Sequence, residues 1–103
     1  MKIIEKISDM IENEIEEAEK YAKCALTYKD ERPQLADVFY RIGLEKISHI
    51  GLLHGQVVSI IDEYRKSKGE PPEAMKTLYD ILHKKHIEHL AAVKGMLSLY
   101  KEP

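Results

Sequence analysis

Apolar residues spaced alternately three and four positions apart run through the first 28 residues of the chain. The stripe comprises Ile4, Ile7, Ile11, Glu14, Ala18, Tyr21, Ala25 and Tyr28. This spacing is typical of a helix that buries one face against other helices. Glu14 is the one carboxylate in the stripe, and burying a carboxylate without a partner costs several kcal/mol. We therefore expect a positively charged group or a metal ion to lie against Glu14.

Two later stretches carry the same helical pattern. The stripe of residues 34–66 comprises Leu35, Phe39, Ile42, Lys46, His49, Leu53, Gln56 and Ile60. The stripe of residues 73–100 comprises Met75, Tyr79, Leu82, His86, His89, Val93, Leu97 and Tyr100. Pro33 and the segment from Gly69 to Pro72 separate the stretches, and no stretch alternates with the period of two that marks a strand. We predict an all-α fold: an antiparallel bundle of three long helices (2–28, 34–66 and 73–100), completed by homodimerisation.

The bulk composition narrows the class of protein. A length of 103 residues argues for a single domain, 1–103, with one core. With 16 basic and 18 acidic residues, the net charge of −2 offers no basic face for a nucleic acid. The lone cysteine fits a reducing compartment, and the charged start of the chain does not resemble a signal peptide. No apolar run approaches a membrane span. We therefore expect a cytoplasmic protein without nucleic-acid or membrane partners.

The polar residues of the three stripes are expected to lie at one level. At a rise of about 1.5 Å per residue, Glu14 and His49 lie roughly 21 to 24 Å from the first interhelical turn. His86 and His89 lie roughly 21 to 26 Å from the second turn, and Lys46 lies one helical turn from His49. Antiparallel packing would therefore bring these five side chains into one polar layer halfway along the bundle.

Each of these residues also allows a plainer interpretation. Glu14 belongs to the acidic run 12–17 and would move to the flank of its helix if the buried line were Ile11, Ile15, Ala18 and Ala22. His49 could form a hydrogen bond with Glu45, one turn earlier. His83, His86 and His89 are too widely spread around a helix for all three to face inward, and His86 and His89 fit the stripe better. His54 lies on a different stripe, as a flank or interface residue.

A set of residues between positions 10 and 65 resembles a known family. They are Glu14, Ala18, Tyr21, Pro33, Leu35, Ala36, Phe39 and His49. The pattern resembles the ferritin-like superfamily, particularly its rubrerythrin branch and the small ferritin-like proteins of anaerobic bacteria and their phages. In that family a glutamate on the first helix precedes a tyrosine by seven positions, as Glu14 precedes Tyr21. The second helix then supplies a Glu-x-x-His pair that binds iron beside the first glutamate.

The chain departs from this family at the second ligand. Lys46 stands where the family has its bridging glutamate, and a protonated amine repels a cation. Lys46 could instead neutralise Glu14 directly, whereas Glu45 could supply the missing oxygen ligand because it lies one turn from His49. The third helix, with His86 and His89, replaces the second half of the family's site. A two-fold dimer could provide that half.

Two functions follow from these observations. The resemblance implies a ferritin-like protein that binds iron, or zinc or manganese, through Glu14, Glu45, His49, His86 and His89, with Tyr21 and Lys46 beside the ligands. It would also imply oxidation of Fe(II) by oxygen or peroxide, although the sequence favours a binding protein over an enzyme. The alternative is a degenerate bundle without metal that serves as a structural or protein-interaction module. In both cases we expect a homo-oligomer.

Overall fold

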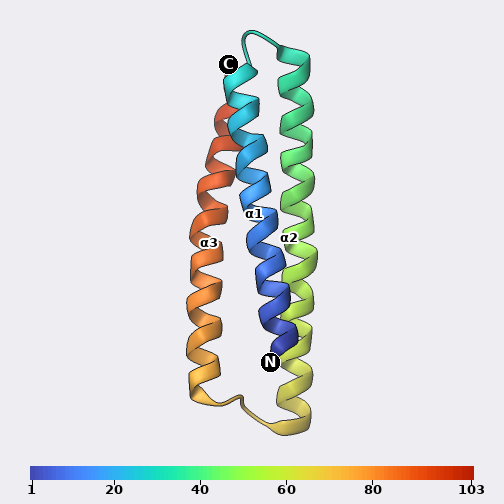
Figure 1. Ribbon diagram of the computed structural model, residues 1–103, viewed down its shortest axis with the longest axis vertical. Coiled ribbons are helices and arrows are strands. Elements are labelled where there is room, and N and C mark those ends of the chain that lie inside the picture. Colours follow the sequence, from blue (N-terminus) through green and yellow to red (C-terminus); the bar gives the residue numbers. More distant parts are fainter.

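The computed structural model describes all residues 1–103 and consists of three long helices without a strand. The helices are α1 (Lys2–Tyr28), α2 (Pro33–Lys68) and α3 (Glu73–Lys101). α1 and α3 run in the same direction and α2 runs against both, in a rod of 56 × 19 × 18 Å (Figure 1). The predicted three-helix bundle is confirmed, and the observed helix ends lie within two residues of those predicted. None of the helices has a stretch apolar enough to cross a bilayer.

Proline and glycine set the helix boundaries. Pro33 occupies the first turn of α2, where its missing N–H would lack a helical partner in any case. Gly69 ends α2 with a positive φ of 80°, and its N–H donates to the carbonyl of Arg65. Pro72 directly precedes α3. The chain therefore reverses at both ends through short connections, which makes the successive helices antiparallel.

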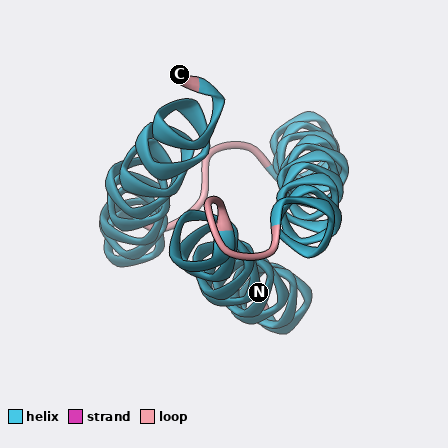
Figure 2. Cartoon of the chain, turned by 90° about the horizontal axis from the view of Figure 1, so that it is seen from above, coloured by secondary structure: helices cyan, strands magenta, loops and turns pink.

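α1 is the central helix of the bundle and supplies most of its core. Figure 2 shows α1 lying against both other helices, with α2 and α3 farther from each other. The core cluster comprises Ile7, Ile11, Ile15, Ala18, Ala22, Ile50, Val93 and Leu97. The prediction that Glu14 and Tyr21 lie on the buried line is wrong, since the alternative line through Ile15 and Ala22 is the buried one. Glu14 therefore lies on the flank of α1.

Candidate functional site

The two flanks of α1 present carboxylates to different helices. Between helices, Glu12 and Glu19 contact α3, whereas Glu14 and Glu17 contact α2. A rotation of about 100° per residue explains this division, because it places the two pairs on opposite sides of the buried line. The expected polar layer thus exists, but the core of α1 divides it into two clusters.

The cluster between α1 and α2 is centred on Lys46. Its ammonium lies 2.7 Å from Glu17 Oε2 and 3.4 Å from Glu14 Oε2. His49 Nδ1 lies 3.6 Å from the same Glu14 oxygen. The hydrogen bond with Glu17 raises the pKa of Lys46 and lowers the pKa of Glu17, so both groups are charged at neutral pH. Lys46 is therefore the positive partner that Glu14 was expected to have.

This cluster does not fit the iron site that the sequence resemblance implies. A lysine ammonium occupies the space between the carboxylates, where it repels a cation and has no lone pair to donate. Glu45, the predicted substitute ligand, is exposed and takes part in none of the ion pairs. Tyr21 packs its ring against Phe39, with ring centres 6.1 Å apart, and its hydroxyl forms no hydrogen bond. The structure thus brings Glu14, Lys46 and His49 together without the other predicted members.

The cluster between α1 and α3 joins two carboxylates to two imidazoles. Glu12 Oε2 lies 3.4 Å from His86 Nε2, and Glu12 Oε1 lies 3.4 Å from His89 Nδ1. The other nitrogen of His89, Nε2, lies 2.6 Å from Glu19 Oε2. The side chains of Glu12 and His86 are 22% and 12% exposed. This is the most sheltered group of ionisable side chains with metal-ligand chemistry in the bundle.

The pKa values of the two histidines in this cluster are shifted in opposite directions. The hydrogen bond with Glu19 raises the pKa of His89 and helps to lower the pKa of Glu19. Burial lowers the pKa of His86, since the protonated ring would lose its hydration. At neutral pH His86 is therefore uncharged and keeps a nitrogen lone pair.

Two carboxylate oxygens lie buried without a hydrogen-bond partner: Glu12 Oε2 and Glu14 Oε2. Charge-assisted hydrogen bonds span about 2.7 to 2.9 Å, so the 3.4 Å between Glu12 and His86 is too long for one. As the side chains stand, the donor atoms of no three His, Cys, Asp or Glu residues gather around one point. The orphaned Glu12 oxygen thus has imidazoles nearby but no bonded partner.

The sequence predicts His86 and His89 in the layer but does not single out Glu12 and Glu19. The stripe at alternating spacing passes through Glu14 and so predicts Glu14 as the inward-facing carboxylate. A usable signal was present: Glu12 and Glu19 are seven residues apart and so share one face of α1, as His86 and His89 share one face of α3. This spacing makes the four residues candidates, but the sequence does not record which face of α1 meets which face of α3.

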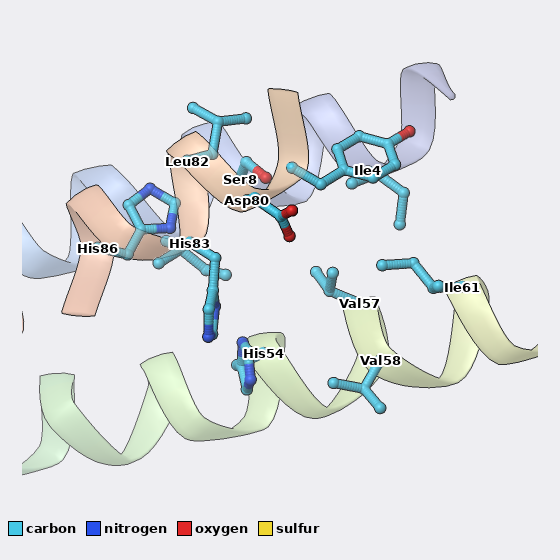
Figure 3. A pocket seen from close by; sticks show the side chains of 12 residues that line it. Ile4, Ser8, His54, Val57, Val58, Ile61, Asp80, Leu82, His83 and His86 are labelled. Carbon is cyan, nitrogen blue, oxygen red and sulfur yellow. The ribbon is translucent and has the colours of Figure 1, made fainter. Parts of the chain in front are cut away.

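A third set of histidines lies outside the layer, in a groove between α2 and α3. The rings of His54 and His83 stack across the groove with centres 4.9 Å apart. Figure 3 shows these two rings reaching toward each other from opposite helices, with His86 close by on α3. Val57, Val58 and Ile61 line the same groove on α2.

Compared with known proteins, the chain matches no family model, no curated protein and no solved structure. Its function must therefore be argued from the chemistry of its own side chains.

Proposed function

We propose that the protein binds one first-row divalent metal ion, Fe(II) or Zn(II), through Glu12, His86 and His89. The observation that carries this proposal is the buried Glu12 oxygen that lacks a hydrogen bond and lies beside an uncharged imidazole. A buried carboxylate without a partner is costly, and a cation would remove that cost. One carboxylate and two imidazoles form a donor set that both zinc and non-haem iron use.

The spacing of the donor atoms supports this assignment. Metal–ligand bonds of about 2.0 to 2.1 Å in a tetrahedral site place neighbouring donor atoms about 3.3 to 3.4 Å apart. Each Glu12 oxygen has an imidazole nitrogen at 3.4 Å. Binding would require the His86 and His89 rings to turn so that both nitrogens and a Glu12 oxygen share one ion. Three protein ligands leave a position open for water or a small molecule.

Glu19 is proposed to position His89. Its carboxylate accepts a hydrogen bond from His89 Nε2, which leaves Nδ1 facing Glu12. A carboxylate behind a histidine ligand fixes the ring orientation and makes the other nitrogen a better donor. Because an ion must displace the proton that the raised pKa of His89 favours, metal affinity is expected to rise with pH.

The proposal keeps the bundle within the ferritin-like superfamily but moves the ion. The long antiparallel helices and the polar layer at mid-height support that classification, together with the proximity of Glu14 and His49. On the α1–α2 side, Lys46 takes the place of a metal. The ion is therefore proposed on the α1–α3 side, where no lysine is among the ion-pair partners of Glu12.

Metal titration of the untagged, metal-free protein tests the proposal. Calorimetry with Zn(II), and absorption spectroscopy with Co(II) as a probe of the ligand set, should show one ion per chain. Glu12→Gln, His86→Gln and His89→Gln should each weaken binding by about tenfold or more. Glu14→Gln and His49→Gln are matched controls on the other flank and should bind like the wild type. A wild-type protein that takes up neither ion, or a loss of affinity confined to the control variants, would overturn the assignment.

The competing function is a metal-free structural bundle. It is favoured by the raised pKa of His89, because a protonated ring could pair with Glu12 and Glu19 at once. In that case the cluster would act as an ion-pair network between α1 and α3. Failure to bind any ion in the titration would select this function.

A further inference from the structure

An apolar groove runs along the bundle between α2 and α3. α1 forms its floor and the two other helices form its walls. The groove has three adjoining sections. Ile47 lines both the upper section, near the C-terminus of α3, and the middle section. The stacked rings of His54 and His83 bridge the groove between the middle section and the lower one. Eight residues of α1 are buried, but only three of α2 and two of α3. α2 and α3 thus keep apolar side chains that the chain itself does not cover.

Three exposed apolar side chains lie on the groove walls. Leu44 and Val58 on α2 and Ile87 on α3 are exposed, Ile87 to 52%. The outline of the whole rod in side view, 56 × 19 Å, covers about 1,000 Å². A stable interface of standard size buries roughly 800 Å² per partner. A second copy docked on this side would therefore have to cover most of the length of the rod.

On one face of α3, acidic residues precede Ile87 and basic residues follow it at the same spacings. Positions spaced by seven residues stay on one helix face, with a drift of about 20° per step. On α3 these positions are Glu73, Asp80, Ile87, Lys94 and Lys101. Asp80 lines the lower section of the groove, whereas Lys94 and Lys101 line the upper section. An antiparallel copy of α3 centred on Ile87 would place each acidic residue opposite a basic one.

On α2, an acidic and a basic residue lie at equal distances on either side of Gly51. The positions of α2 at the same spacing are Asp37, Leu44, Gly51, Val58 and Arg65. Gly51 is exposed, and no atom lies within 4 Å of the position that its Cβ would occupy, so another helix could approach closely there. Gly51 and Ile87 line the same section of the groove and hence lie at one level. The charge patterns of α2 and α3 are therefore centred at the same level of the rod.

We propose that two copies dock face to face and antiparallel over this groove. The two-fold axis would cross the rod at the level of Gly51 and Ile87. Such an axis sets α3 against the α3 of the second copy and α2 against its α2. Lys94 then pairs with Asp80 twice, and Leu44 packs against Val58 twice. The net charge of −2 per chain adds little repulsion between the copies.

Measurement of the mass in solution gives the first test. Light scattering of the full chain should give twice the mass of one chain at micromolar concentration. Ile87→Glu places two carboxylates at the axis and should weaken the dimer by at least about tenfold. Ile81→Glu is the matched control, because Ile81 is 60% exposed on the same helix but does not line the groove. A wild-type monomer, or equal effects of the two variants, would overturn the proposal.

Two further variants test the direction of pairing. Asp80→Lys should weaken the dimer by about fivefold, and adding Lys94→Asp should restore it. In a Cys24→Ser background, Ile87→Cys should form a disulfide between copies on mild oxidation, whereas Ile81→Cys should not. If the two copies were parallel, α3 would lie against the second copy's α2. If the groove instead bound a helix of another protein, the chain alone would be monomeric. Absence of the Ile87→Cys crosslink would therefore exclude the antiparallel arrangement.

Discussion

Two glutamates only two residues apart on α1 meet different chemistry. Glu14 faces an ammonium, which neutralises it directly, whereas Glu12 faces two imidazoles, one of which is uncharged at neutral pH. The difference arises because two residues turn a helix by about 200°, so the two side chains emerge on opposite sides of the buried line. A single helix thus carries an ion pair with a lysine on one flank and a carboxylate beside two imidazoles, the proposed metal site, on the other.

Removal of the Lys46 ammonium should destabilise the fold. Lys46→Met leaves the buried oxygen of Glu14 with His49 alone, and we expect the free energy of unfolding to fall by about 1 to 3 kcal/mol. Urea denaturation measures this loss. Adding Glu14→Gln should recover part of it, because the unpaired charge is then gone. Arg41→Met removes an exposed pair with Asp37 and should cost well under about 1 kcal/mol. Equal losses in the two methionine variants would contradict this account of Lys46.

The two histidines of the α1–α3 cluster should affect stability in opposite directions with pH. The folded-state pKa of His89 is raised, so its stabilisation is fully present below about pH 6.5 and is lost as the pH rises through the folded value. The folded-state pKa of His86 is lowered, so stability is lost as the pH falls below about 6.5. His89→Gln should therefore cost more stability at about pH 5.5 than at pH 8, and His86→Gln should cost less at the lower pH. Thermal melts of both variants at the two pH values measure these losses of stability. If the two losses changed with pH in the same direction, this interpretation would be wrong.

At the scale of the helices, the boundaries could be predicted from sequence but the rotation of α1 could not. Pro33, Gly69 and Pro72 interrupt the helical pattern by local chemistry, so they fix the helix ends whatever the tertiary structure. The two candidate buried lines of α1 share Ile11 and Ala18. They differ in whether Glu14 and Tyr21 or Ile15 and Ala22 are buried with them. Which line is buried depends on how α2 and α3 approach α1 from two sides, and no local signal records that. For the same reason, the sequence does not predict that Glu12 faces α3.

Close packing at one helix glycine should be visible in stability. A Cβ at Gly43 would lie 3.2 Å from Leu97 Cδ2, which is buried, whereas a Cβ at Gly95 would meet nothing within 4 Å. Gly95→Ala should therefore raise the free energy of unfolding by about 0.5 to 1 kcal/mol through helix propensity. Gly43→Ala should not raise the free energy of unfolding in this way, because its methyl group would press on Leu97. Denaturant unfolding of both variants tests this, and equal stabilisation would show that Leu97 yields freely.

At the scale of the whole molecule, the level of the polar layer was predictable and its partners were not. Helix rise and short turns place Glu14, His49, His86 and His89 at similar heights regardless of side-chain detail. The pairing of Glu12 with both α3 histidines depends on the angular positions of three helices at once. The open groove has the same origin, because α1 separates α2 from α3 along most of the rod. The proposed metal site and the proposed docking face therefore both depend on the central position of α1.

The most direct test of the proposed metal site is an anomalous difference map from crystals of the wild-type protein grown with Zn(II). The account predicts a zinc peak within about 2.0 to 2.2 Å of a Glu12 carboxylate oxygen and of one nitrogen each of His86 and His89. Zinc bound only between His54 and His83, zinc bound beside Glu14 and His49, or an empty map at saturating zinc would contradict it.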